Sequence, residues 1–226
     1  MITLEGVHKS FRRGGVTTHI ARGITARFPA NQSVALLGRN GAGKSSLLKM
    51  IAGTLDPDRG RVRVAGSVSW PVGFAGSFHG DLTGAQTARF LARLYGVDTG
   101  AMVASVARFT ELGDKLHHPV RTYSTGMKAR LAFGASMAIP FDTYLVDEVT
   151  SVGDAAFKEK SKTVFLDRLS RSGAIVVSHT LPMLREICTA GAVLHDGTLT
   201  WHDDIETAID HHSDLLRVEP APRRAA

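Results

Sequence analysis

A glycine-rich octapeptide at residues 38–45, Gly-Arg-Asn-Gly-Ala-Gly-Lys-Ser, has the residue types and the spacing needed to bind phosphate. It fits the pattern G-x-x-x-x-G-K-[ST] in full, follows an apolar run and opens a helical pattern, which is the context that this pattern requires. Glycines let backbone N–H groups curl around phosphate oxygens, and a helix N-terminus adds partial positive charge. We expect Lys44 to reach the β- and γ-phosphates of a nucleotide and the Ser45 hydroxyl to bind Mg²⁺.

Two adjacent carboxylates, Asp147 and Glu148, follow the apolar run 143–146. A carboxylate at a strand end beside a phosphate loop can hold Mg²⁺ through water, so we assign that role to Asp147. Glu148 can then orient and polarise the attacking water. The alternative is a strand that is followed by the acidic cap of a helix.

Two further positions have suitable chemistry but weaker signals. Ser124 and Gly126 form a Ser-x-Gly turn before a helical pattern, which can bind a second anion or simply cap the helix. His179 follows the apolar run 175–177, where an imidazole can be catalytic or structural. The order and spacing of these positions along the chain give them their interest.

Alternating strand and helix patterns separate these positions. We predict strands over residues 2–7, 25–28, 33–37, 61–64, 68–70, 143–146 and 175–177. Predicted helices cover residues 44–51, 83–95, 101–110, 128–138 and 154–169. Asp196 and Gly197 separate two short apolar runs, 192–195 and 198–201, which indicates a hairpin. The alternation predicts an α/β fold with a parallel core, and the helical stretch in the middle of the chain indicates an inserted lobe.

The overall composition is that of an ordinary globular protein. The 226 residues are 43% hydrophobic and 21% charged, and Cys188 alone excludes an intrachain disulfide. The start of the chain has no apolar stretch of signal-peptide length, and no run approaches the roughly 20 apolar residues that span a bilayer. The net charge of +6 fits a solvated basic surface, and it also permits binding to nucleic acid or to an anionic membrane leaflet.

The ordered set of motifs resembles the ABC ATPase family over nearly the whole chain. The resemblance implies an α/β P-loop NTPase fold of the ABC ATPase type, with an N-terminal antiparallel β region and an inserted helical subdomain. We expect residues 1–217 to form the nucleotide-binding domain, with its helical subdomain at about 71–139. The Pro-, Arg- and Ala-rich residues 218–226 read as a disordered tail.

The resemblance also assigns roles to individual residues. Glu148 matches the catalytic glutamate, His179 the switch histidine that senses the γ-phosphate, and Ser151–Asp154 the D-loop. Phe11 matches the aromatic that stacks on adenine, although a core or edge aromatic is the alternative. The signature, usually LSGGQ, is represented by Ser124, Thr125, Gly126 and Met127. The residues expected to contact ATP are thus Phe11, Gly38, Arg39, Asn40, Gly41, Ala42, Gly43, Lys44, Ser45, Ser46 and the four signature residues.

One departure from the family separates this chain from most of its members. The family places a glutamine between its two lobes, but the only glutamines here are Gln32 and Gln86, so we assign none to that role. The runs SWPVGFAGSFHGDLTG, YSTGMKARLAFGASMA and YLVDEVTSVGDAAFK resemble the branch that exports bacterial capsular polysaccharide, and relatives that export O-antigen or teichoic acid share part of this vocabulary. About 25 residues follow the predicted hairpin, too few for the carbohydrate-binding domain of some of those relatives.

The resemblance implies a working unit and a location. ATP with Mg²⁺ is held between the phosphate loop of one subunit and the signature of another, so we expect a homodimer with two sites. A polytopic permease subunit would anchor it at the cytoplasmic face of the bacterial inner membrane, and the complex, not this chain, would handle the polysaccharide. Nucleic acid is not an expected partner.

Three alternatives differ in what they leave unexplained. The ATPase of another exporter or of an importer fits the motifs and differs in substrate. A DNA-maintenance ATPase suits the basic charge, but such proteins carry long coiled-coil insertions that this chain lacks. A simple P-loop kinase accounts for residues 38–45 and not for Ser124, Glu148 or His179.

Overall fold

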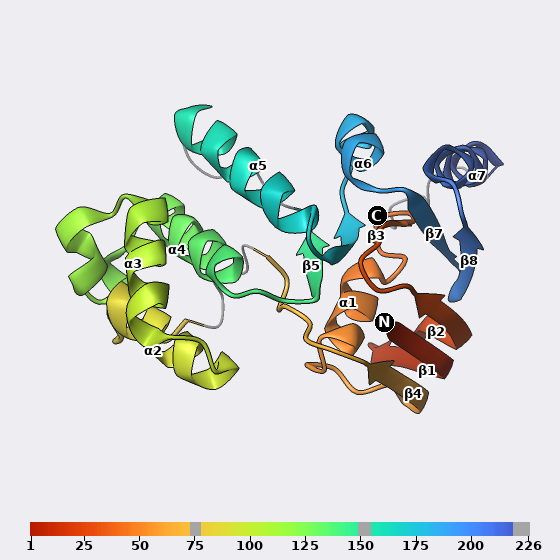
Figure 1. Cartoon of the computed structure of the whole chain (residues 1–226). Coiled ribbons are helices and arrows are strands. Elements are labelled where there is room, and N and C mark those ends of the chain that lie inside the picture. The colour runs from red at the N-terminus through yellow and green to blue at the C-terminus, as the bar shows by residue number, and fades with distance from the viewer. Residues whose placement is uncertain (73–77, 149–154, 219–226) are drawn as a thin grey trace, which may run out of the picture. The chain divides into compact units, whose positions relative to one another are not determined.

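A computed structural model describes residues 1–72, 78–148 and 155–218, and contacts divide the chain into two units (Figure 1). The first unit consists of the described residues of Met1–Val68, Asp142–Glu148 and Ser172–Ala226. The second consists of the described residues of Ser69–Phe141 and Val149–Arg171. The chain therefore passes from the first unit into the second and back again, and it does so twice.

The first unit contains two β-sheets. The smaller is antiparallel, with the order β2-β1-β4, and is formed by β1 (Ile2–Arg13), β2 (Val16–Phe28) and β4 (Arg59–Val64). The larger has the order β5-β6-β3-β7-β8 and is formed by β5 (Thr143–Asp147), β6 (Gly173–Val177), β3 (Ser33–Leu37), β7 (Ala190–His195) and β8 (Thr198–His202). Its first four strands are parallel, and β8 pairs with β7 in the predicted antiparallel hairpin. The predicted α/β fold with a parallel core and an N-terminal antiparallel region is confirmed.

Helix α1 (Lys44–Ile51) joins the two sheets through one apolar core. It contacts β2 and β4 of the smaller sheet and β5 of the larger. Leu47, Leu48 and Ile51 of α1 are buried in the same cluster as Leu4 of β1 and Ile175 of β6. Each fully buried side chain of this kind contributes about 1.5–3 kcal/mol to folding. This packing holds the first turn of α1 in place beneath the loop that precedes it.

Two helices of the first unit were not predicted from the sequence, namely α6 (Leu181–Ile187) and α7 (Ile205–Val218). Helix α7 packs on β3, β7 and β8, and Ala208 lies so close to Gly191 that a Cβ there would be 2.3 Å from the alanine Cβ. Arg185 of α6 donates two hydrogen bonds from Nε and one from Nη2 to the carboxylate of Glu206 on α7. These contacts fix the position of α7 against the larger sheet.

The second unit is helical. Its helices are α2 (Gly84–Tyr95), α3 (Thr99–Thr110), α4 (Thr125–Ala138) and α5 (Ala155–Leu169), with two short 3₁₀ helices, η1 (Gly113–His117) and η2 (Val120–Thr122). Phe109 of α3 stacks on Phe133 of α4 with ring centroids 5.4 Å apart, and meets Phe157 of α5 edge-on at 5.2 Å. These aromatic contacts hold the described part of α5 against α3 and α4.

The predicted elements match the structure best where the pattern is locally complete. The strand 33–37 and the helix 44–51 have the predicted bounds. The predicted strand 68–70 is wrong, because Val68 forms only an isolated bridge to Thr143. Trp70 instead packs against Tyr95 and Phe141 within the second unit, at centroid distances of 5.4 and 5.6 Å. Its aromatic neighbours, not a β-ladder, determine its position.

Candidate nucleotide site

The phosphate loop lies between β3 and α1, and two of its glycines are required by close contacts. A Cβ at Gly38 would lie 2.4 Å from the carbonyl oxygen of Leu194 on β7, and one at Gly43 would lie 2.3 Å from Cγ2 of Ile20 on β2. Gly43 also has φ of 104°, in the left-handed region that favours glycine. The neighbouring strands thus hold the loop close to the sheet, where its backbone N–H groups can face a phosphate.

Lys44 is buried at the start of α1 and already makes hydrogen bonds. Its Nζ donates to the carbonyl oxygen of Gly38 at 2.6 Å and to that of Arg39 at 3.0 Å. Burial lowers the pKa of Lys44, and the negative charges of Glu148 and Asp147 oppose that shift. The ammonium is therefore held over the loop by carbonyl groups, whose place phosphate oxygens can take.

Ser45 and Ser46 occupy the first turn of α1. Ser45 is exposed and Ser46 is half-buried. The helix begins after Gly43, and no side chain among the described residues caps its first backbone N–H groups. These N–H groups, the helix dipole and the serine hydroxyls make the turn suitable for an anion with its counter-cation.

The two predicted carboxylates lie at the end of β5, beside β6. Asp147 pairs with Val177 in the parallel register, and the Glu148 N–H donates to the carbonyl oxygen of Val177 at 2.9 Å. Glu148 has φ of 48°, which is uncommon for a residue with a side chain and marks local backbone strain. Its Oε1 lies 2.8 Å from Nε2 of His179. The structure thus brings Glu148 and His179, 31 positions apart in the sequence, into hydrogen-bonding contact.

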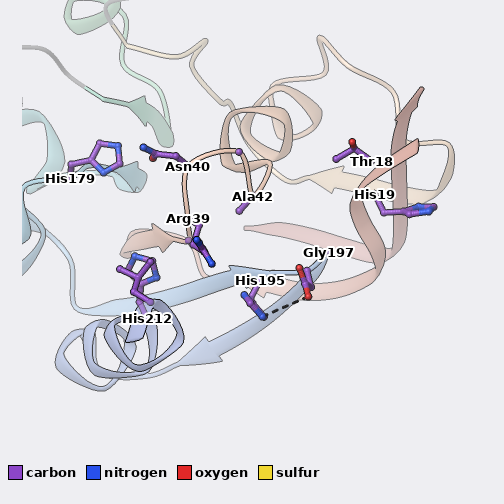
Figure 2. A pocket seen from close by; sticks show the side chains of 13 residues that line it. Thr18, His19, Arg39, Asn40, Ala42, His179, His195, Gly197 and His212 are labelled. Atoms are coloured by element: carbon purple, nitrogen blue, oxygen red, sulfur yellow. Dashed lines mark ion pairs between the residues drawn. The ribbon is translucent and has the colours of Figure 1, made fainter. Parts of the chain in front are cut away.

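A pocket of about 840 Å³ opens over the phosphate loop (Figure 2). The loop contributes five residues to its lining, Gly38, Arg39, Asn40, Gly41 and Ala42. The remaining lining residues are Thr18, His19, His179, His195, Asp196, Gly197, His212 and Leu216. All of them belong to the first unit, so the phosphate loop, the switch-histidine position and the β7–β8 turn border one cavity.

The contributions of the β7–β8 turn and of α7 to this pocket were not predicted from the sequence. The turn had been predicted, but nothing in the sequence placed His195 near the phosphate loop. Helix α7 did leave a signal. Ile205, Ala208, Ile209 and His212 follow the i, i+3, i+4, i+7 spacing of one helix face, and the first three are buried.

Phe11 lies on β1, where it pairs with Thr18 of β2, one of the residues that line the pocket. The residue is 43% exposed, and the ammonium of Lys9 lies 5.5 Å from the ring centroid. An exposed ring is not a core aromatic, which leaves stacking on a base or an edge position for Phe11. The adenine role stays a prediction.

Replacing Phe11 by alanine should weaken ATP binding by about 1–3 kcal/mol if adenine stacks on the ring, because that is the typical contribution of an aromatic–base stack. Phe11→Tyr should bind as wild type, since the stacking face is kept. Titration of ATP into the three proteins measures the effect. Equal affinities would remove Phe11 from the site.

The signature residues lie on the second unit, at the start of α4. Ser124 is the N-cap of this helix, and its Oγ accepts a hydrogen bond from the Met127 N–H at 3.2 Å. The capping role considered for Ser124 is therefore confirmed. Gly126 is open, because a Cβ there would meet only the Ser124 Oγ, at 3.9 Å, among the described residues. Packing within the described chain does not require a glycine at this position.

Both glutamines have other structural roles. Gln86 is the third residue of α2 and completes a capping box, accepting from the Thr83 N–H at 2.8 Å while its own N–H donates to Thr83 Oγ1. Gln32 Nε2 donates to Thr189 Oγ1 at 3.0 Å. These contacts agree with assigning neither to the loop between the lobes. Residues 73–77 of that loop, the D-loop residues 151–154 and residues 219–226 of the predicted tail 218–226 lie outside the described residues, whereas Val218 is the last residue of α7.

Comparisons with known proteins agree on one family. The profile of the ABC transporter family matches residues 21–151. The polysialic acid transport ATP-binding protein KpsT of Escherichia coli is 42% identical over 94% of this chain and 96% of its own length. The capsule polysaccharide export ATP-binding protein CtrD of Neisseria meningitidis is 39% identical over 95% of this chain and its full length.

Solved structures support the same fold. An ATP-binding subunit of an ABC transporter has a TM-score of 0.80 at 18% identity and covers 96% of this chain, with 99% of its own chain aligned. A dimeric ATP-binding cassette bound to ADP and phosphate has a TM-score of 0.76 and covers 91%. At this identity the likeness concerns the fold, while the family profile and the close relatives establish the family. The chain belongs to the ABC transporter family, as one of its ATP-binding and ATP-hydrolysing subunits.

Proposed function

We propose that this subunit powers the export of a capsular polysaccharide. Similarity along the whole length of named relatives carries the proposal. KpsT and CtrD transport polysialic acid and capsule polysaccharide, according to their names, and this chain covers 96–100% of their lengths. A teichoic acid export protein, TagH of Bacillus anthracis, is 31% identical and is covered over only 36% of its length. Capsular polysaccharide is therefore favoured as the exported substrate over teichoic acid.

Within this proposal, the first unit supplies the hydrolytic chemistry. Lys44 exchanges its bonds to the Gly38 and Arg39 carbonyls for bonds to the β- and γ-phosphates. Glu148 accepts a proton from the attacking water or polarises it, and His179, 2.8 Å away, orients the carboxylate and contacts the γ-phosphate. The short contact between the two supports a joint role, because each side chain limits the position of the other.

The residues present also fit Mg²⁺. Magnesium prefers hard oxygen ligands, and Ser45 and Asp147 offer a hydroxyl and a carboxylate. The charge of Asp147 acts on Lys44, so the carboxylate lies within electrostatic range of the phosphate loop. When bound, Mg²⁺ would neutralise charge on the phosphates; Ser45 and Asp147 are the residues that would hold it.

We also propose a homodimer in which the signature of one subunit meets the nucleotide of the other. Two observations support it. The open backbone at Gly126 lets a phosphate approach closely, and the N-terminus of α4 has the polarity to receive an anion. Ser124 would keep its capping bond while its backbone and hydroxyl face the nucleotide, and Thr125 and Met127 would line the approach.

A permease partner follows from the transport role. Among the described residues, no helix combines the length and apolar character needed to cross a membrane. From the transport role, and from the export and transport names of the relatives, we place the subunit at the cytoplasmic face of the bacterial inner membrane, held there by a polytopic permease. In this arrangement the polysaccharide passes through the complex without binding this chain.

Deleting the gene tests the transport role. Because this subunit supplies free energy and not synthesis, polymer should accumulate in the cytoplasm while the cell surface loses its capsule. Wild-type protein should restore the surface polymer, and the Glu148→Gln variant should not. The measurement is staining of polymer inside and outside intact cells.

Two outcomes would contradict the proposal. A normal surface capsule in the deletion strain, in a cell without a second exporter, would exclude capsule export. Loss of both internal and surface polymer would assign the gene to synthesis or its regulation. Neither outcome would affect the ATPase assignment, which rests on the family.

A further inference from the structure

The pocket over the phosphate loop contains more imidazoles than the family motifs account for. Of its lining histidines, only His179 occupies a motif position. His212 comes from α7, a helix outside every motif, and its side chain extends from that helix toward the phosphate loop (Figure 2). His212 is therefore one of three lining histidines, with His19 and His195, that have no role so far.

The charged groups that act on the pKa of His212 are positive, although the Asp196 carboxylate lines the same pocket and α7 itself carries Asp210 and Asp214. Lys44, His179 and His211 are the charged neighbours that act on it, and Arg39 lines the same pocket. Helix α7 packs against β3, β7, β8 and α6, whose charged or titratable groups are His195 on β7, His202 on β8, and Arg185 and Glu186 on α6. His202 lies 2.8 Å from His211, Arg185 is paired with Glu206, and His195 lies 3.8 Å from Asp196.

These surroundings oppose protonation in the free protein. Burial lowers the pKa of His212, and the positive charges of Lys44, His211 and His179 lower it further. At neutral pH the free side chain is therefore neutral. Even as its Mg²⁺ complex, a nucleotide triphosphate carries about two negative charges, which would favour the protonated form of His212.

We propose that His212 is a nucleotide-binding residue that takes up a proton from solvent when the triphosphate binds, and that it then donates a charge-assisted hydrogen bond to a phosphate oxygen. The inference rests on the assignment of the phosphate loop as the nucleotide site. It adds a cationic contact from α7 to the contacts proposed for the first turn of α1. The gain in charge is supplied by one proton, so no other reactant is needed.

The linkage has a definite sign. Protons bind more tightly to the nucleotide complex than to the free protein, so nucleotide affinity falls as the pH rises between the two pKa values of His212. For one linked proton, the dissociation constant rises by up to about tenfold per pH unit in this window. Since burial and the positive neighbours lower the pKa of the free side chain, the window begins below the ordinary histidine value and extends upward to the pKa of His212 in the complex.

Isothermal titration calorimetry tests the proposal. The probe is the Mg²⁺ complex of a β,γ-imido analogue of ATP, titrated at several pH values from about 6 to 8 in buffers with different ionisation enthalpies. Wild type should take up protons on binding. His212→Gln should lose this uptake and its part of the pH dependence. His211→Gln is the matched control on the same helix; it should keep most of the uptake, because His211 is not among the residues that line the pocket.

A permanently charged side chain gives an independent arm. His212→Arg should bind the analogue without proton uptake, and at the upper end of the pH range it should bind more tightly than wild type. This arm also covers the case in which His212→Gln does not fold. Equal proton uptake by wild type and the folded His212 variants would overturn the proposal and assign the proton to another group. Binding by wild type without uptake would also overturn it while leaving the nucleotide site intact, whereas no binding at all would reject the site itself.

Discussion

Glu148→Gln should lower ATP turnover by about a hundredfold to ten-thousandfold, the range typical for loss of a general base. Glutamine keeps the size of the side chain and can still bond to His179, but it cannot accept a proton from water. Binding of ATP should persist, because the Lys44 contacts with the loop do not depend on Glu148. Steady-state phosphate release and ATP titration, made on the same preparation, measure the two quantities separately.

Glu5→Gln provides the matched control for this carboxylate. Glu5 lies on β1, where it forms a largely exposed ion pair with Arg63 at 3.3 Å, and such pairs contribute little. The ATP turnover of the Glu5→Gln protein should equal that of wild type. If the Glu148→Gln protein hydrolyses ATP at the normal rate, the assignment of Glu148 as the catalytic base is wrong, and the contact with His179 has a structural purpose only.

Lys44→Ala should reduce both ATP affinity and turnover. A hydrogen bond to a charged group contributes about 1.5–3 kcal/mol, which corresponds to roughly ten- to more than a hundredfold weaker binding. Loss of the positive charge also removes stabilisation of the phosphate in the transition state, so turnover at saturating ATP should fall by about a further hundredfold or more. Equilibrium binding and saturating turnover distinguish the two contributions.

Lys49→Ala is the corresponding control within α1. Lys49 is exposed and lies in the last turn of the same helix. The substitution therefore removes a positive charge that does not reach the phosphate loop. Circular dichroism and a thermal melt should show that both variants keep the wild-type fold. A folded Lys44→Ala protein with wild-type affinity and turnover would contradict the phosphate-binding role of Lys44.

The sequence predicted those parts of the site that local patterns encode. The run from β3 into α1 was predicted with its bounds, because an apolar strand, a glycine-rich loop and an amphipathic helix follow one another without interruption. The carboxylates at the end of β5 were also predicted as a pair. The contact between Glu148 and His179 was not predicted, because it depends on the parallel register that sets Asp147 beside Val177.

Other features could not be predicted because they are tertiary. The left-handed backbone at Glu148 has no marker in its residue type, since glutamate rarely adopts that conformation. The contribution of α7 to the pocket could not be predicted, because it depends on where the helix packs on the sheet. The spacing of Ile205, Ala208 and Ile209 would have predicted the helix itself. Trp70 alternates with Val68 on either side of Ser69 and was therefore predicted to lie in a strand, but its aromatic partners come from distant positions.

The chain crosses between its two units after residues 68, 141, 148 and 171, and three of these crossings begin or end at one cluster in the first unit. The Asp142 carboxylate accepts hydrogen bonds from the Ser67 N–H at 2.7 Å and from Ser67 Oγ at 2.8 Å, and the Gly173 N–H donates to the Asp142 carbonyl oxygen at 2.9 Å. Adjacent entry and exit points of this kind let an inserted segment change its length or be exchanged by recombination without breaking a strand of its host. The fourth crossing leaves directly from Glu148. Changes of length within the segment between residues 68 and 142 can therefore leave the strands of the first unit intact, whereas an insertion or deletion next to Glu148 would displace the proposed catalytic carboxylate.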